Sequence, residues 1–569
     1  MSRKDRLRLA LSGSPAPKAR QNVARAAGPG NQARCEIGAP KGRQNARSVA
    51  PFGARSLRCR EQSRAFGPGY ILAPPSGAPR SQRGRCPGFI SRSLLVSALL
   101  LVWALPLLAD VPLEEAAARL RAKHQLGTAK LGLCVVDLGT GKTILDIGGD
   151  QPLAPASNMK LVTSAAALER LGAEFEFRTV LYRRGQVDGS GTLHGDLAVI
   201  GAGDPNVSGR YFAGDPTAIF KQWADHLLAA GVKRVEGDLL LDDTLFDREL
   251  TAPEWPQDQL SNWYAAQVTA LALNDDCIDI TLRAGSAPGK PARVSLSPDT
   301  RYVTIENECT TTADKDEHAF GFSRVPGTNR IKVTGKILVG AEPEATSITI
   351  HDPTMYFGTV LAETLRAKGI TIGGAPKRAD KPLRPKEDGL DAVCAYAVDL
   401  KRTIATMNKR SQNFYAEMLI KLVGSRAKGE GSWKAGCAAV SEFLAAAGAA
   451  EGEYDIRDGC GLSPTNRISA RALARVLAYE RARPGGEAYF ESLAKGGEGT
   501  LEKRLKDPDL ADGLRAKTGY IAGASALSGY VKAPDGGWLA FAILVNRFKS
   551  LSDARSFQDD LVRTLARGK

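Results

Sequence analysis

Ser157 and Lys160 form a pair whose residue types and spacing suit covalent catalysis. A spacing of three residues places both side chains on one face of a helix. A neutral Lys amine in that position can take the Ser proton and make the hydroxyl a nucleophile. The same spacing occurs at Ser425 and Ser492, so spacing alone does not identify a site. Ser157 differs from both because it follows a Pro-rich loop and opens a strongly apolar helix; the structural alternative is a simple helix N-cap.

Two further motifs follow Ser157 along the chain. Ser411-Gln412-Asn413 is the only Ser-x-Asn, and Lys517-Thr518-Gly519 is the only Lys-Thr-Gly. We expect Ser411 to lie within a helix and relay a proton to a leaving amine, while the amide of Asn413 binds a substrate carbonyl. Lys517 and Thr518 are expected on a strand edge, where they can bind a terminal carboxylate. The order of the three motifs, with the uniqueness of two, favours a shared active site over surface residues.

A Lys can act as a general base only when its amine is neutral. We therefore expect the pKa of Lys160 to be lowered by burial and by the nearby positive charge of Lys517. The hypothesis predicts that Lys160→Arg folds but does not form an acyl-enzyme.

These motifs resemble those of the penicilloyl-serine transferases. Their surroundings are similar to the D-Ala-D-Ala carboxypeptidase/endopeptidase family of class C low-molecular-mass penicillin-binding proteins, over residues 112–565. The long interval between Ser157 and Ser411 is also typical of that family, which carries two extra β domains there. Further similar stretches are Pro155-Ala156-Ser157, Gly195-Asp196-Leu197, Gly203-Asp204-Pro205, Ser411 to Glu417, Asp458 to Ser463 and Gly499-Thr500-Leu501.

The resemblance implies further features of the site. It places an oxyanion hole at the backbone N–H groups of Ser157 and Tyr520, with Thr518 and Gly519 also binding substrate. It implies no cofactor and no metal. Cys460 stands where the family usually has Ser, and because Cys is nearly isosteric with Ser we expect a structural role rather than a redox role.

The activity implied by the resemblance is a serine D-Ala-D-Ala carboxypeptidase/endopeptidase. Its substrates would be peptidoglycan stem peptides, cleaved through an acyl-enzyme on Ser157, and β-lactams would inhibit it by acylating the same residue. Two alternatives stay open: a β-lactamase, which would turn over nitrocefin rapidly, and a non-catalytic cell-wall-binding scaffold, which would not be labelled by a fluorescent penicillin.

The predicted elements place the three motifs in an α+β fold. We expect a β-lactamase/transpeptidase-like domain, with an antiparallel sheet covered by helices on both faces, interrupted by a β-rich insertion of two small domains. Apolar alternation predicts a hairpin over 131–147 and late strands over 513–518, 525–531 and 538–545. Helical spacing predicts helices after Ser157 and over 355–368, 404–423, 437–447 and 552–565. The transpeptidase-like domain is expected at 110–190 and 351–569, with the insertion at 191–350.

The start of the chain differs in composition from the rest. Residues 1–92 hold 19 Lys and Arg against 3 Asp and Glu, whereas the remaining residues hold 58 and 59. We expect 1–92 to be a disordered basic leader and 93–109 to be a signal peptide cleaved near Ala109. A signal in that place favours a translation start downstream of Met1.

Charge, cysteines and histidines limit the partners of the chain. The basic excess lies in the leader, so we expect no nucleic-acid binding and at most peripheral contact with a membrane. The six cysteines after the signal lack CxxC spacing and the five His are scattered, so neither set predicts a metal site. The predicted location is the periplasm or cell envelope.

Overall fold

The computed structural model describes residues 35–36 and 112–568. The predicted leader and signal peptide therefore lie outside the described residues, except for the two-residue strand β1 (Cys35–Glu36). None of the helices in the described ranges combines the length and the apolar composition that a membrane crossing requires.

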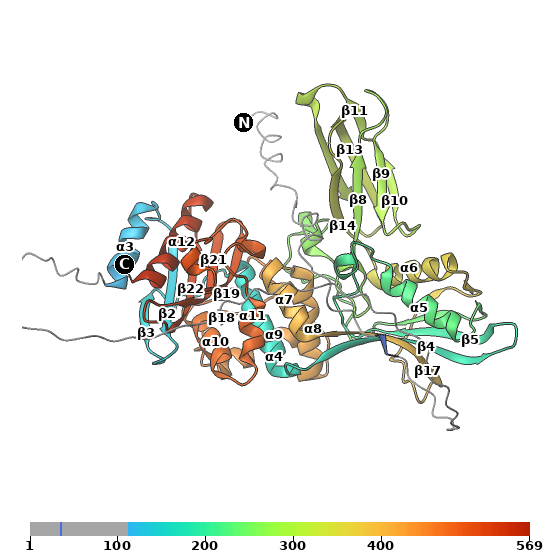
Figure 1. Ribbon diagram of the computed structural model, residues 1–569, viewed down its shortest axis with the longest axis horizontal. Helices are drawn as coiled ribbons and strands as arrows, with labels where there is room; N and C mark the ends of the chain where they lie inside the picture. The colour runs from blue at the N-terminus through green and yellow to red at the C-terminus, as the bar shows by residue number, and fades with distance from the viewer. Residues whose placement is uncertain (1–34, 37–111, 569) are drawn as a thin grey trace, which may run out of the picture. The chain divides into compact units, whose positions relative to one another are not determined.

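Five antiparallel strands form the sheet that carries the Lys-Thr-Gly motif, in the order β20-β21-β22-β2-β3. Figure 1 shows the early strands β2 and β3 beside the late strands β21 and β22. The predicted union of distant chain segments in one sheet is thus observed, with β20 at its edge. The strands are Lys130–Asp137 (β2), Thr143–Ile147 (β3), Leu514–Ile521 (β20), Ala524–Lys532 (β21) and Trp538–Asn546 (β22).

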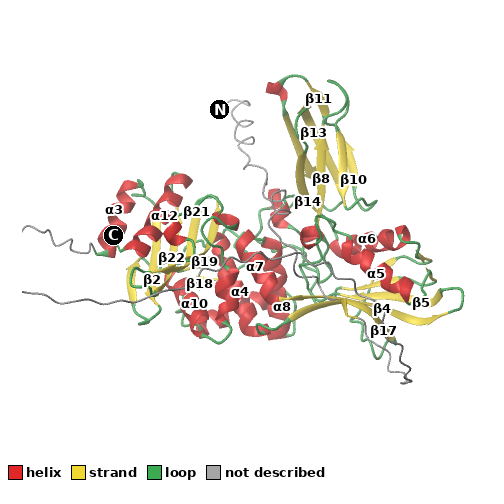
Figure 2. Ribbon diagram, in the orientation of Figure 1, coloured by secondary structure: helices red, strands yellow, loops and turns green. Residues whose placement is uncertain are grey.

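Helices cover both faces of this sheet (Figure 2). Side chains alternate along β2, so Leu133 and Val135 pack in one core with the first and last helices, whereas Cys134 and Val136 pack in the opposite core. The first face holds α3 (Leu113–Lys123) and α12 (Leu551–Arg567). The second core is built with α4 (Met159–Leu171), α7 (Leu400–Arg410), α8 (Asn413–Lys428), α9 (Trp433–Ala446), α10 (Ala470–Ala482) and α11 (Gly486–Ser492), beside the short pair β18 (Tyr454–Asp455) and β19 (Arg467–Ile468).

A second sheet has eight strands, of which all but β1 lie between α4 and α7 in the sequence. It packs against two helices, α5 (Ala218–Ala229) and α6 (Pro353–Ala367). Phe220, Trp223 and Phe357 form an aromatic cluster in its core. The sheet extends on both sides of 191–350, and the boundaries predicted for the insertion stay predictions. Besides β1, its strands are Glu176–Val187 (β4), Thr192–Ile200 (β5), Arg234–Val235 (β6), Leu239–Asp242 (β7), Thr371–Ile372 (β15), Pro376–Arg378 (β16) and Leu390–Asp399 (β17).

Two small sheets follow within 277–349. One has the order β14-β8-β9; in the other, β13 pairs with β10, β11 and β12. Side chains from both sheets, including Leu282, Val333 and Ile337, form a small shared core. The strands are Cys277–Arg283 (β8), Arg293–Ser297 (β9), Thr304–Asn307 (β10), Thr310–Thr312 (β11), Ala319–Arg324 (β12), Arg330–Leu338 (β13) and Glu344–Thr349 (β14).

The structure adds one helix to the sequence predictions and corrects another. The β-rich stretch also contains α5, whose buried residues recur at helical spacing. The helix predicted over 404–423 is two helices, because Ser411 between α7 and α8 takes a left-handed conformation with φ 57°. Ser411 therefore caps α7 instead of lying within a helix.

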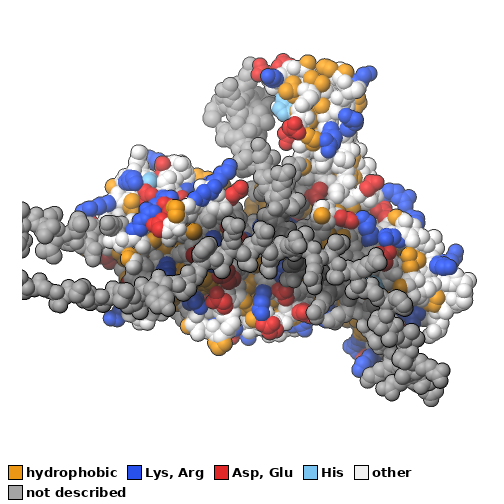
Figure 3. Space-filling view, in the orientation of Figure 1, with side chains coloured by type: hydrophobic (Ala, Val, Ile, Leu, Met, Phe, Trp, Pro, Cys, Tyr) orange, Lys and Arg blue, Asp and Glu red, His pale blue; other side chains and the backbone are white. Residues whose placement is uncertain are grey.

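The surface reflects the charge balance of the chain after residue 92. On the described part of the face in Figure 3, basic and acidic side chains are interspersed. This mixture agrees with the nearly equal numbers of acidic and basic residues in that part of the sequence.

Candidate active site

Ser157 lies in a single 3-10 turn, Ala156–Asn158, directly before α4. The preceding residue, Ala156, has a positive φ of 46°, a conformation that an L-residue adopts only when its surroundings hold it there. Two glycines provide those surroundings. A Cβ at Gly461 would overlap with the carbonyl oxygen of Ala156, and a Cβ at Gly519 would lie 2.7 Å from the carbonyl oxygen of Pro155. The turn that presents Ser157 is thus clamped between a loop and strand β20.

Lys160 is buried below this turn and its amine has three acceptors. Lys160 Nζ lies 3.0 Å from Ser157 Oγ, 2.7 Å from Asn413 Oδ1 and 2.8 Å from the carbonyl oxygen of Cys460. Burial lowers the pKa of Lys160, while the charges of nearby acidic groups, Glu417 among them, oppose this shift. Both the distance to Ser157 and the direction of the pKa shift suit a proton acceptor.

The left-handed Ser411 directs its hydroxyl toward Lys517. Lys517 Nζ donates to Ser411 Oγ at 2.9 Å and to the carbonyl oxygen of Thr518 at 2.7 Å. Asn413 begins α8, where its Oδ1 accepts from Lys160 and its Nδ2 donates to the carbonyl oxygen of Tyr264 at 2.9 Å. The two motifs therefore reach one site through separate hydrogen bonds, one to each lysine.

Lys517 is fully buried on β20, which lowers its pKa well below the usual value. The positive charge of Lys160 adds to this lowering. Sequence reasoning expected the repulsion between the two lysines to lower the pKa of Lys160; in the structure it adds to the effect of burial at Lys517. With both pKa values lowered, the site disfavours two charged ammonium groups at once.

Gly519 brings β20 against the turn that contains Ser157. The position of a Cβ at Gly519 would lie only 3.1 Å from the backbone nitrogen of Ser157, so any larger residue would separate strand and turn. Tyr520 follows at the exposed side of the same strand. Because β20 is an edge strand, its backbone beside Ser157 can pair with an extended peptide.

A cavity of about 410 Å³ opens in front of these groups. Its lining joins Ser157 and Ser411 to residues of two further segments, 499–504 and α12. Thr518 Oγ1 lies 2.8 Å from Thr500 Oγ1, which ties the first of these segments to the Lys-Thr-Gly strand. The full lining is Ser157, Ser411, Gly499, Thr500, Glu502, Lys503, Arg504, Thr518, Gly519, Tyr520 and Arg555.

Sequence reasoning did not identify all of these groups. Thr500 lies in a stretch whose only sequence signal is its resemblance to the family, and Arg555 lies in no local motif. The carbonyl of Cys460 is a main-chain group, which residue type cannot reveal. Its thiol is buried, in agreement with the structural role expected for Cys460.

Behind Lys160, the described residues include one cluster with ligand-type side chains: Glu417, Asp458 and Cys460, all buried. Asp458 already accepts from the indole of Trp255 and from three N–H donors of its own loop. Glu417 accepts from the indole of Trp433 at 2.6 Å, and burial raises its pKa to about 7. These bonds fix the loop whose Cys460 carbonyl contacts Lys160.

The sequence profile of the D-Ala-D-Ala carboxypeptidase 3 (S13) family matches residues 113–568. The D-alanyl-D-alanine carboxypeptidase of Actinomadura sp. (strain R39) is 33% identical over 494 residues, which cover 82% of this chain and 89% of that protein. DacB of Haemophilus influenzae is 24% identical over 426 residues, covering 74% and 86%. The crystal structure of penicillin binding protein 4 (dacB) from H. influenzae superposes with a TM-score of 0.68 at 23% identity, over 79% of this chain and 99% of that one.

These similarities confirm the predicted fold class and the predicted serine-type D-Ala-D-Ala carboxypeptidase activity. They cover the segments that carry Ser157, Ser411 and Lys517. The chain belongs to the D-Ala-D-Ala carboxypeptidase 3 (S13) family.

Proposed function

We propose that Ser157 is the nucleophile of this carboxypeptidase and that Lys160 is its general base. Ser157 Oγ attacks the carbonyl carbon of the penultimate D-Ala while its proton passes to Lys160 Nζ. Ser411, hydrogen-bonded to Lys517, relays this proton from Lys160 to the departing D-Ala amine as the peptide bond breaks, so that the Ser411 hydroxyl and the neutral Lys160 amine are both restored. Water then attacks the acyl-enzyme ester, releasing the shortened peptide and restoring the Ser157 hydroxyl.

Backbone and amide donors complete the proposed mechanism. The N–H groups of Ser157 and Tyr520 stabilise the oxyanion, a role supported by the close approach of β20 to the turn at Gly519. One N–H of the Asn413 amide is bound to Tyr264, and the second is available for a substrate carbonyl.

The proposed substrates are peptidoglycan stem peptides. A terminal D-Ala as leaving group gives carboxypeptidase activity, and a cross-linking amine gives endopeptidase activity. Penicillin binding protein 4 of H. influenzae has been solved in complex with a β-lactam, and we expect a β-lactam to acylate Ser157 here by the same attack. We therefore also propose that the enzyme acts in the periplasm or cell envelope.

The contact that carries this proposal is the 3.0 Å distance between Lys160 Nζ and Ser157 Oγ. Intact-protein mass spectrometry after incubation with benzylpenicillin tests it directly. We expect one penicilloyl adduct per chain, mapped to the peptide that contains Ser157, and none in Ser157→Ala. Ser425→Ala is the matched control, because Ser425 has the same spacing to a Lys but lies at the far end of α8, and it should be labelled normally. An adduct on another residue, or rapid turnover of nitrocefin, would contradict the proposal.

A further inference from the structure

The cavity in front of Ser157 is lined by three basic residues, Lys503, Arg504 and Arg555. It is also lined by Ser411, the proposed proton donor to the leaving amine, and by Thr518. A terminal D-Ala carries a carboxylate there. Which of the cations binds that carboxylate decides how the enzyme selects free chain ends.

Lys517 is poorly suited to this task. Its amine is fully buried and already donates to Ser411 and to the Thr518 carbonyl. Burial and the charge of Lys160 both disfavour its protonated form. The hydroxyl of Thr518 can still donate to a carboxylate, but a positive charge must come from elsewhere in the cavity.

Arg504 is already neutralised. Its guanidinium binds both carboxylate oxygens of Asp559 and also donates to Gln558 Oε1. Both members of the Arg504–Asp559 pair are largely buried, so the pair is poorly exposed to a ligand. Arg504 Nη2 also lies 3.4 Å from the carbonyl oxygen of Arg555, which holds it against α12.

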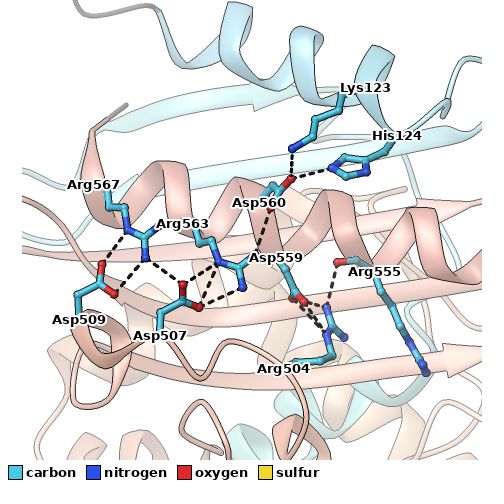
Figure 4. A network of polar contacts seen from close by, with 10 residues as sticks. All are labelled: Lys123, His124, Arg504, Asp507, Asp509, Arg555, Asp559, Asp560, Arg563 and Arg567. Carbon is cyan, nitrogen blue, oxygen red and sulfur yellow. Dashed lines mark hydrogen bonds and ion pairs between the residues drawn. The ribbon is translucent and has the colours of Figure 1, made fainter.

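Arg555 is the arginine of this cavity without a carboxylate partner among residues 112–568. Figure 4 shows its side chain extending away from the ion pairs that α12 makes through Asp559, Asp560 and Arg563. Its guanidinium carbon lies 5.7 Å from the centre of the Tyr520 ring, which orients it over the strand next to Gly519. Both side chains are exposed to the cavity opening.

We propose that Arg555, oriented by Tyr520, binds the terminal carboxylate of the leaving D-Ala and thereby makes the enzyme prefer substrates with a free C-terminus. A planar guanidinium can bind a carboxylate through two parallel hydrogen bonds, while Thr518 Oγ1 supplies a further donor. This inference rests on the proposed function, because Ser411 defines the leaving-group side.

The test compares two substrates in the full-length enzyme. The substrates are a pair of acyl-D-Ala thioesters whose leaving groups end either in a carboxylate or in its methyl ester, and thiol release reports turnover. For Arg555→Ala we expect KM for the carboxylate substrate to rise about tenfold with kcat little changed, and kcat/KM for the methyl ester to stay at the wild-type value. Arg555→Lys, which keeps the charge but loses the bidentate geometry, should recover part of the loss.

Two controls make the outcome specific. Lys549→Ala removes an exposed cation just before α12 that does not line the cavity, and it should leave both substrates unaffected. If Arg555→Ala turned over both thioesters like the wild type, or lost activity on both equally, the inference would be overturned while the proposed function stood. If neither thioester acylated the wild-type enzyme at Ser157, the proposed function itself would fail.

Discussion

At the scale of single residues, the surroundings of the Lys160 amine suit both proton states that its proposed role as general base requires. Its three acceptors match the three N–H donors of an ammonium. When the amine is neutral, Asn413 and Cys460 can take its two remaining donors and leave the lone pair facing Ser157. The same contacts therefore hold the base before and after it takes the Ser proton.

Replacing this amine tests the assignment of the base. We expect Lys160→Arg to fold but to lose acylation by about a thousandfold, because a guanidinium stays protonated and cannot accept a proton. Stopped-flow acylation with a β-lactam measures the rate, and circular dichroism checks the fold. Acylation at the wild-type rate in a folded variant would refute the assignment.

The buried Glu417 behind Lys160 makes stability depend on pH. Its pKa is raised from 4.5 to about 7, so the folded state holds a proton that the unfolded state releases between these values. The contribution of protonated Glu417 to the free energy of unfolding is therefore complete below about pH 4.5. This contribution is lost as the pH rises through about 7, and the total loss is about 3 kcal/mol.

Glu417→Gln should remove this contribution to the pH dependence. Relative to the variant, the wild-type enzyme should lose unfolding free energy between pH 5 and pH 8, measured by urea denaturation. Glu451→Gln, at an exposed position, serves as the control and should follow the wild type. An unchanged pH dependence in Glu417→Gln would show that this carboxyl ionises normally.

At the scale of elements, the site is assembled where helices end and where a strand passes a turn. Ala156 and Ser411 both have left-handed backbones. The first directs the hydroxyl of Ser157 in the turn before α4, and the second directs its own hydroxyl at the end of α7. The edge strand β20 then places Lys517 and Gly519 against these breaks. Small shifts of the strand should therefore affect chemistry before they affect folding.

Gly519→Ala tests that dependence. The added Cβ would meet Pro155 O at 2.7 Å and Ser157 N at 3.1 Å, so β20 and the turn that contains Ser157 must move apart. We expect kcat/KM for D-Ala release to fall by about a hundredfold, since a displacement of this kind disturbs the reacting geometry, with a much smaller change in Tm. Gly189→Ala, where a Cβ meets nothing within 4 Å, should keep full activity. Equal activity of the two variants would show that the close contact between Gly519 and the turn containing Ser157 is not needed for activity.

The sequence predicted which segments meet at the candidate site better than it predicted their backbone conformations. Motif order grouped side chains that are hydrogen-bonded to one another in the structure, and alternation along 131–147 and 513–545 predicted the sheet. The break between helices at Ser411 could not be predicted from apolar spacing. Because α7 and α8 both bury apolar faces, the helical pattern continues across the break. The Cys460 carbonyl and Arg555 could not be predicted, since their roles arise from tertiary contacts without a local signature.

At the scale of the whole molecule, three segments that are far apart in the sequence meet at the proposed reaction centre. Ser157 and Lys160 come from the start of α4, Ser411 and Asn413 from the α7–α8 break, and Lys517 from β20. The match to the S13 family spans all three. The arrangement therefore predicts hydrolysis of D-Ala-D-Ala ends by this centre.

Mass spectrometry of muropeptides tests this claim most directly. Purified pentapeptide muropeptides are incubated with the wild-type enzyme and with Ser157→Ala. We expect the wild type to convert them to tetrapeptides with release of one D-Ala each, and the variant to leave them intact. Conversion by a folded Ser157→Ala enzyme at the wild-type rate would show that Ser157 is not the nucleophile.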